Sequence, residues 1–127
     1  MSLRRIFPLA ALLTTAALPS MTFADSTGSP GYVISLTVHE SSSDLYGTYR
    51  GSVTIRQGQE PGSTQTEYRW GGTLCSGRNV TEANIELLTI ALRGRSDTQI
   101  VPRYKMGQGG VRCLVSFTLQ EPVLAAR

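Results

Sequence analysis

Apolar and polar residues alternate along most of this 127-residue chain, and one window breaks the alternation. A period of two is typical of strands that bury one face, whereas apolar residues three and four positions apart are typical of an amphipathic helix. The strand pattern recurs in five segments: residues 32–39, 45–56, 64–74, 98–106 and 111–119. The helical pattern occupies residues 80–93, so the predicted order is strand, strand, strand, helix, strand, strand.

The helical window carries signals at both of its ends. Asn79 can cap the N-terminus with Glu82 three positions later, which is a capping-box arrangement. Gly94 follows the window and suits a left-handed C-cap. The apolar positions that would face the core include Ile85, Leu88 and Leu92. These signals favour a helix over a buried strand in the same window.

The patterns together predict an α+β domain. An antiparallel sheet of about five strands would bury its apolar face under the one helix. Pro102 cannot donate a hydrogen bond to a neighbouring strand, so the strand at 98–106 is expected at an edge of the sheet. If residues 85–92 form a buried strand instead, a small all-β sandwich or barrel is the alternative fold.

The first 24 residues have the three parts of a secretory signal peptide. Arg4 and Arg5 precede an uncharged apolar run, and the small residues Thr22 and Ala24 predict cleavage after Ala24. The run is shorter than the roughly 20 residues that span a bilayer, so no transmembrane segment is expected after cleavage. The protein is therefore expected in the periplasm or outside the cell. The predicted divisions that follow are a flexible leader at 25–31, a single domain at 32–120 and a flexible tail at 121–127.

The chain has only two cysteines, and export would place both in an oxidising compartment. They allow one intramolecular pairing, Cys75 with Cys113. A cross-link that closes a loop of about 39 residues stabilises a domain by roughly 4 kcal/mol, through the entropy of the unfolded chain. The alternation of the last strand also predicts that Cys113 faces inward with Val115 and Phe117.

The charge argues against a nucleic-acid-binding protein. Loss of Arg4 and Arg5 with the signal lowers the count of Lys and Arg from 12 to 10, against 9 acids, so the net charge falls from +3 to +1. Strand alternation nevertheless gathers cations on the sheet face away from the helix. This candidate binding face comprises Tyr46, Arg50, Arg56, Arg69, Arg103, Lys105 and Arg112.

A glycine-rich stretch before the helix forms a second candidate site, an anion-binding loop of Gly71, Gly72, Gly77 and Arg78. Free amides and the helix dipole favour anions at such places. The spacing matches neither the P-loop nor the dinucleotide-binding motif. The alternative interpretation is a tight connection whose glycines let Cys75 reach Cys113.

Signals for catalysis and for metal binding are weak. His39 is the only histidine, and a catalytic triad would need a serine and an acid that converge on it from elsewhere. The sequence contains no Gly-x-Ser-x-Gly motif and no Cys-x-x-Cys, His-x-x-x-His or calcium-loop spacing. No metal and no cofactor are therefore expected.

These features predict an exported, non-enzymatic binding protein. It has the size of a periplasmic inhibitor, an immunity-type protein or a surface antigen, and would engage a protein or an anionic envelope component through the candidate binding face. Two alternatives stay open. One is a small exported hydrolase or lytic accessory that uses His39, and the other is a structural subunit of an envelope assembly that pairs through the edge near Pro102.

Overall fold

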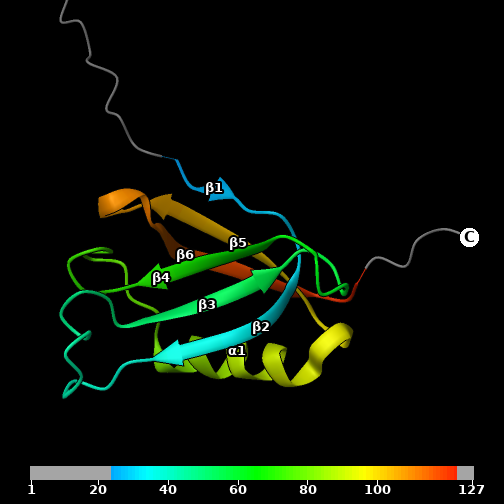
Figure 1. Cartoon of the computed structure of the whole chain (residues 1–127), viewed down its shortest axis with the longest axis horizontal. Coiled ribbons are helices and arrows are strands. Elements are labelled where there is room, and N and C mark those ends of the chain that lie inside the picture. The colour runs from blue at the N-terminus through cyan, green and yellow to red at the C-terminus, as the bar shows by residue number, and fades with distance from the viewer. Residues whose placement is uncertain (1–23, 123–127) are drawn as a thin grey trace, which may run out of the picture.

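A six-stranded sheet with one helix forms the part of the protein that the computed structural model describes, residues 24–122 (Figure 1). The strands are β1 (Ser26–Thr27), β2 (Tyr32–Val38), β3 (Gly51–Arg56), β4 (Gln65–Trp70), β5 (Gln99–Met106) and β6 (Arg112–Gln120). Helix α1 (Glu82–Gly94) lies between β4 and β5, and short 3₁₀ turns cover Arg95–Asp97 and Gln108–Gly110. The predicted α+β class is confirmed, and the all-β alternative is wrong.

The remaining residues, 1–23 and 123–127, lie outside the described part. They hold nearly all of the predicted signal peptide and most of the predicted flexible tail at 121–127. Within the described part, no helix has the length and apolar character needed to cross a membrane.

The sheet consists of two antiparallel units, which are joined by a short parallel contact and by an isolated bridge between Gly31 and Ile100. Its strand order is β1-β5-β6-β4-β3-β2. Strands β2, β3 and β4 form one unit, and β1, β5 and β6 form the other. The two units join where β4 and β6 run parallel, with Arg69 opposite Cys113 as their one registered pair. This strand pairing has the fewest registered residue pairs in the sheet.

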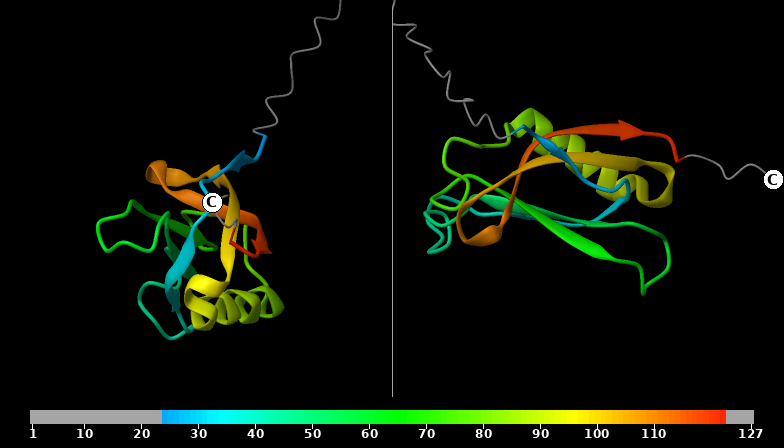
Figure 2. Two further views of the ribbon diagram at one scale, coloured as in Figure 1. Left: turned by 90° about the vertical axis from the view of Figure 1, so that its right-hand side faces the viewer. Right: turned by 90° about the horizontal axis from the view of Figure 1, so that it is seen from above.

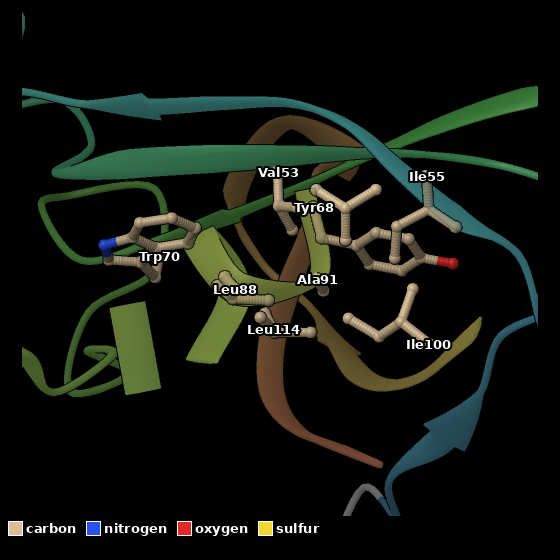
Figure 3. Close-up of a cluster of buried hydrophobic side chains, with 9 residues drawn as sticks. Val53, Ile55, Tyr68, Trp70, Leu88, Ala91, Ile100 and Leu114 are labelled. Atoms are coloured by element: carbon tan, nitrogen blue, oxygen red, sulfur yellow. The ribbon is translucent and has the colours of Figure 1, made fainter. Parts of the chain in front are cut away.

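The core lies between the sheet and α1 (Figures 2 and 3). Each large apolar side chain buried there contributes on the order of 1.5–3 kcal/mol. The labelled members of the cluster are Val53, Ile55, Tyr68, Trp70, Leu88, Ala91, Ile100 and Leu114, all 3% exposed or less. Because the helix covers this face alone, the opposite face of the sheet is left open.

Two β-bulges change which residues face the core. In β2 the register shifts between Val33 and Ser35, so Val33 is buried although strict alternation from Leu36 would turn it outward. A second shift beside Tyr104 sets Leu114 in the core. Cys113 pairs with Lys105 instead and faces away from the core, so its predicted phase with Phe117 is wrong. A bulge inserts one residue and thereby reverses the phase beyond it.

The segment expected to be a flexible leader is part of the sheet. Ser26 and Thr27 pair with β5, and the Gly28 amide donates to the Pro102 carbonyl at 2.8 Å. Gly31 exchanges two further backbone bonds with Ile100. Strand β5 is therefore covered at Pro102 rather than being the sheet's edge. The proline fits because its side lacking an N–H faces the short strand β1, which makes few hydrogen bonds.

Both predicted helix caps are wrong in detail. The N-cap is Thr81, whose Oγ1 accepts a bond from the Asn84 amide at 3.2 Å. Asn79 lies two residues earlier, with its side-chain oxygen against Gly71. At the other end Gly94 is still right-handed, with φ −70°, and leads into the 3₁₀ turn. Close approach by the Thr98 side chain, rather than a positive φ, is what favours glycine there.

Strands β3 and β4 are shorter than the predicted strands at 45–56 and 64–74, and the remaining residues form two loops. Residues 45–50 form turns, with the amides of Thr48 and Tyr49 both donating to the Leu45 carbonyl. Strand β4 stops at Gly71 and Gly72, whose φ angles of 72° and 66° a side chain rarely adopts. The two loops consequently meet at the same end of the sheet.

Candidate functional site

The open face of the sheet is polar because alternation turns apolar side chains toward α1. One cross-strand row consists of Thr37, Ser52 and Arg69. The next row consists of Ser35, Thr54 and Glu67. Residues directly opposite on neighbouring strands share a face, so both rows lie on the side away from Val53 and Ile55.

Aromatic and charged side chains gather at the end of this face where the loops meet. The Arg69 guanidinium carbon lies 4.4 Å from the centroid of the Tyr49 ring, and Tyr49 meets His39 edge-on at 4.7 Å. Arg50 stacks on Tyr46 at 5.0 Å. We call this cluster the Arg–Tyr patch; its members are His39, Tyr46, Tyr49, Arg50, Glu67 and Arg69.

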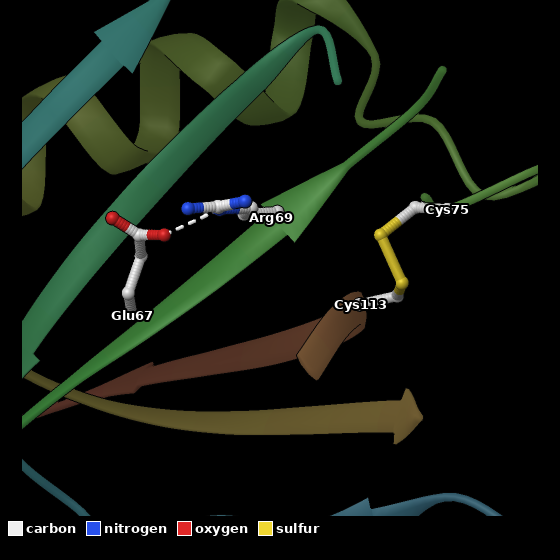
Figure 4. Close-up of polar contacts among 4 residues, drawn as sticks. All are labelled: Glu67, Arg69, Cys75 and Cys113. Atoms are coloured by element: carbon white, nitrogen blue, oxygen red, sulfur yellow. Dashed lines mark hydrogen bonds and ion pairs between the residues drawn. A yellow bond between two sulfur atoms is a disulfide. The ribbon is translucent and has the colours of Figure 1, made fainter. Parts of the chain in front are cut away.

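The contacts within the patch orient its side chains before any partner arrives. Cation–π contacts at exposed sites contribute about 0.5–1 kcal/mol each. Arg69 is also held by Glu67, whose Oε1 accepts a bond from the arginine Nε (Figure 4). Beneath them Ser52 is only 5% exposed, because the surrounding side chains cover the sheet. Ordered side chains lose less entropy on binding than free ones.

The two arginines of the patch differ in charge compensation. The Arg69 side chain is 29% exposed and paired with Glu67, so its charge is largely balanced. Arg50 is exposed and belongs to none of the ion pairs in residues 24–122. Arg50 is therefore the group best able to attract an anion.

The disulfide holds the loop that supports Arg50. The predicted bond between Cys75 and Cys113 is present and ties the loop after β4 to the start of β6 (Figure 4). Amides of this loop reach the other one, with Leu74 donating to the Thr48 carbonyl at 3.1 Å. Gly71 lies so close to the Arg50 stem that an added Cβ would be 2.8 Å from its Cδ. The disulfide thus fixes the loop that packs against the Arg50 side chain.

The candidate anion loop uses its polar groups internally. The Gly71 amide donates to the Arg78 carbonyl at 2.6 Å, and the Arg78 amide donates to Cys75 at 3.0 Å. The Arg78 guanidinium donates to the Met106 carbonyl at 3.0 Å. Gly72 and Gly77 supply positive φ angles to the turn. Because the helix begins only at Glu82, these contacts favour the interpretation as a tight connection.

The structure brings together only three members of the candidate binding face: Tyr46, Arg50 and Arg69. Arg103 and Lys105 lie on β5, where Asp25 approaches them at 3.9 and 3.6 Å. A carboxylate shared by two cations lowers the positive potential there.

The other two members lie farther away. Arg56 ends β3 at the far end from the patch, and its Nε donates to the Gly58 carbonyl at 2.8 Å. Arg112 lies 5.7 Å from the ring of Tyr104, which packs against the core on the helix side. Alternation within a predicted strand could not reveal that Arg56 and Arg112 lie away from the patch.

Tyr49 was missed because the predicted strand over 45–56 assigned it to the buried face. The strand begins at Gly51, so Tyr49 belongs to a turn and can stack on Arg69. The glycines at 47 and 51 were the available signal, since glycine weakens a strand.

The patch offers cations, aromatic rings and one carboxylate, a set suited to binding. The His39 Nε2 is buried and has no hydrogen-bond partner within residues 24–122. In the core, burial raises the pKa of the Tyr68 phenol, which keeps it neutral. Within the same residues no three His, Cys, Asp or Glu side chains are grouped closely enough to hold a metal ion.

Fold and site together define a small disulfide-stapled α+β domain with an Arg–Tyr cluster on its open sheet face. Comparison of the chain with protein-family models, curated proteins and solved structures finds no match.

Proposed function

We propose that this protein is an exported binding protein without catalytic activity, and that the Arg–Tyr patch engages an acidic partner protein. The observation that carries the proposal is the paired stacking of Arg50 on Tyr46 and of Arg69 on Tyr49 on an open sheet face. Tyrosine and arginine are enriched among the residues that dominate binding energy at protein interfaces.

The charge of the patch favours an acidic partner. Arg50 is uncompensated, and cations on an otherwise nearly neutral protein steer anionic groups toward one place. The proposed surface is narrower than the seven-residue candidate binding face. Asp25 balances Arg103 and Lys105, so the β5 side attracts an acidic protein less strongly.

Two observations support export. Disulfides persist in oxidising compartments, and this one lies beside the parallel junction of β4 and β6. Asp25 pairs with β5 side chains, and the first strand begins at Ser26. Cleavage after Ala24 would therefore remove the signal without removing any part of the sheet.

The surroundings of His39 and Pro102 favour binding over the two alternatives. His39 packs against an aromatic ring, whereas a catalytic histidine needs hydrogen bonds to a nucleophile and to an orienting group. The assembly alternative needs a free strand edge near Pro102. Residues 26–28 already bond to that side of β5.

Photo-cross-linking in the source organism tests the proposal. Benzoylphenylalanine in place of Tyr46 keeps an aromatic ring and is expected to capture an acidic protein. The matched control carries the same group at Glu86, an exposed position of α1, and is expected to capture little. Raising the salt from about 50 to 150 mM should reduce the yield at position 46, since salt screens exposed charges. Equal yields at both positions, or a yield independent of salt, would contradict the proposal.

A further inference from the structure

A cavity of about 410 Å³ opens at the other end of β3, away from the Arg–Tyr patch. The start of β2, the hairpin after β3 and the end of α1 line it. Its volume falls within the range of small-molecule sites, about 300–1,000 Å³. Five residue steps of about 3.3 Å along β3 separate Gly51, next to the patch, from Arg56 in the cavity wall. The cavity and the patch are therefore separate sites.

The bulge in β2 shapes one wall of the cavity. The register shift between Val33 and Ser35 leaves Ile34 as the inserted residue. As a result three consecutive residues, at 32–34, line the cavity instead of alternating away from it. Leu92, from the last turn of α1, lines the cavity as well. Bulges occur frequently beside functional sites, where they redirect side chains.

Among the lining residues that the structure describes, Arg56 carries a positive charge and none is acidic. Tyr32, Gln59 and Ser96 are the other polar residues of this described lining. The Arg56 Nε donates to the Gly58 carbonyl at 2.8 Å, which holds the guanidinium in place. Arg56 takes part in none of the ion pairs among the described residues. An anchored guanidinium beside apolar walls is complementary to an amphiphilic anion.

We propose that this cavity binds a medium-chain alkyl carboxylate. The guanidinium of Arg56 pairs with the carboxylate, and Gln59 and Ser96 supply further hydrogen-bonding groups. The alkyl chain packs against Ile34 and Leu92, which are half-buried. One arginine matches the charge and the planar geometry of one carboxylate, whereas a dianionic phosphate would leave an unbalanced charge beside apolar walls.

Titration of isotope-labelled protein with octanoate, followed by amide NMR shifts, tests the proposal. We expect saturable shifts at residues 32–34, 56, 92 and 96. Hexanoate should bind about tenfold more weakly, since each buried methylene contributes about a threefold to fourfold gain in affinity. Octanol should bind more weakly than octanoate, and octylamine should not bind.

Two variants in the cavity and one control variant at the patch locate the contacts. Arg56→Gln is expected to lower octanoate affinity about tenfold or more, through loss of a charge-assisted hydrogen bond. Arg50→Gln removes an equal charge at the patch and should leave octanoate affinity unchanged. Ser96→Phe, at an exposed position in the lining, should fill the cavity and abolish binding even if the Arg56 variant fails to fold.

Three results would overturn the proposal. They are equal affinities for octanol and octanoate, full affinity in the folded Arg56→Gln or Ser96→Phe protein, and shifts confined to the Arg–Tyr patch. None of them bears on the partner proposed for that patch, so the two proposals fail independently.

Discussion

Replacing Cys75 and Cys113 together by serine is expected to lower the free energy of unfolding by about 4 kcal/mol. The bond joins positions 38 residues apart, and its loss returns that loop's entropy to the unfolded chain. Domains are commonly stable by only 5–15 kcal/mol, so the variant should be marginal. Urea unfolding followed by fluorescence of the single tryptophan, Trp70, which is 2% exposed, measures the change.

The loss should begin at the junction of the two sheet units. Strands β4 and β6 share one registered pair. Without the disulfide, the loop over 71–78 would keep only the hydrogen bonds of Arg78 to the Met106 carbonyl and of the Gln108 amide to the Leu74 carbonyl as links, within the described residues, to the connection before β6. Hydrogen exchange is expected to accelerate there before it does in β3. Wild-type protein reduced by a thiol serves as the control and should lose the same stability. A loss below about 1 kcal/mol would mean that the disulfide does not carry this junction.

Reversing the charge of the patch with Arg50→Glu and Arg69→Glu is expected to weaken partner binding at least about 100-fold. Each reversal removes a charge-assisted contact, worth about 1.5–3 kcal/mol, and adds repulsion toward an acidic partner. Folding should change little, because exposed ion pairs such as Arg69 with Glu67 contribute about 0–1 kcal/mol. Calorimetric titration with the protein captured at position 46 measures the effect.

The matched control reverses two exposed arginines elsewhere, Arg93→Glu and Arg112→Glu. Arg93 lies at the end of α1, and Arg112 lies on the helix side of the sheet beside Tyr104. The net charge changes by the same amount, so the affinity should stay within about threefold if the patch acts locally. An equal loss in both double variants would indicate general electrostatic attraction instead.

The sequence alone was sufficient to predict the fold class, because periodicity reports which faces are buried. The helix over 80–93 follows from that signal with small errors at its ends, whereas the strands predicted at 45–56 and 64–74 lose six and five residues to loops. The two-residue strand Ser26–Thr27 is too short to show a period. The bulges reverse phase locally, which is why Leu114 rather than Cys113 faces the core.

The site was harder to predict, because alternation assigns a face but no distance across the sheet. The strand order puts β6 between β4 and β5, which separates Arg69 from Arg103. The pairing of Asp25 with β5 depends on a strand that the pattern did not reveal. Tyr49 joined the patch only because a turn replaced a predicted strand.

The most direct test of the patch as the binding surface is an NMR footprint of the partner on the isotope-labelled protein. Amide signals are expected to broaden or shift at residues 39, 46–50 and 67–69 and to stay unchanged along α1. The helix carries its own exposed apolar residues, Leu87 at 41% and Ile90 at 57%, and so offers a real competing surface. A footprint centred on Leu87 and Ile90, with the Arg–Tyr patch unchanged, would show that the partner binds the helix and not the patch.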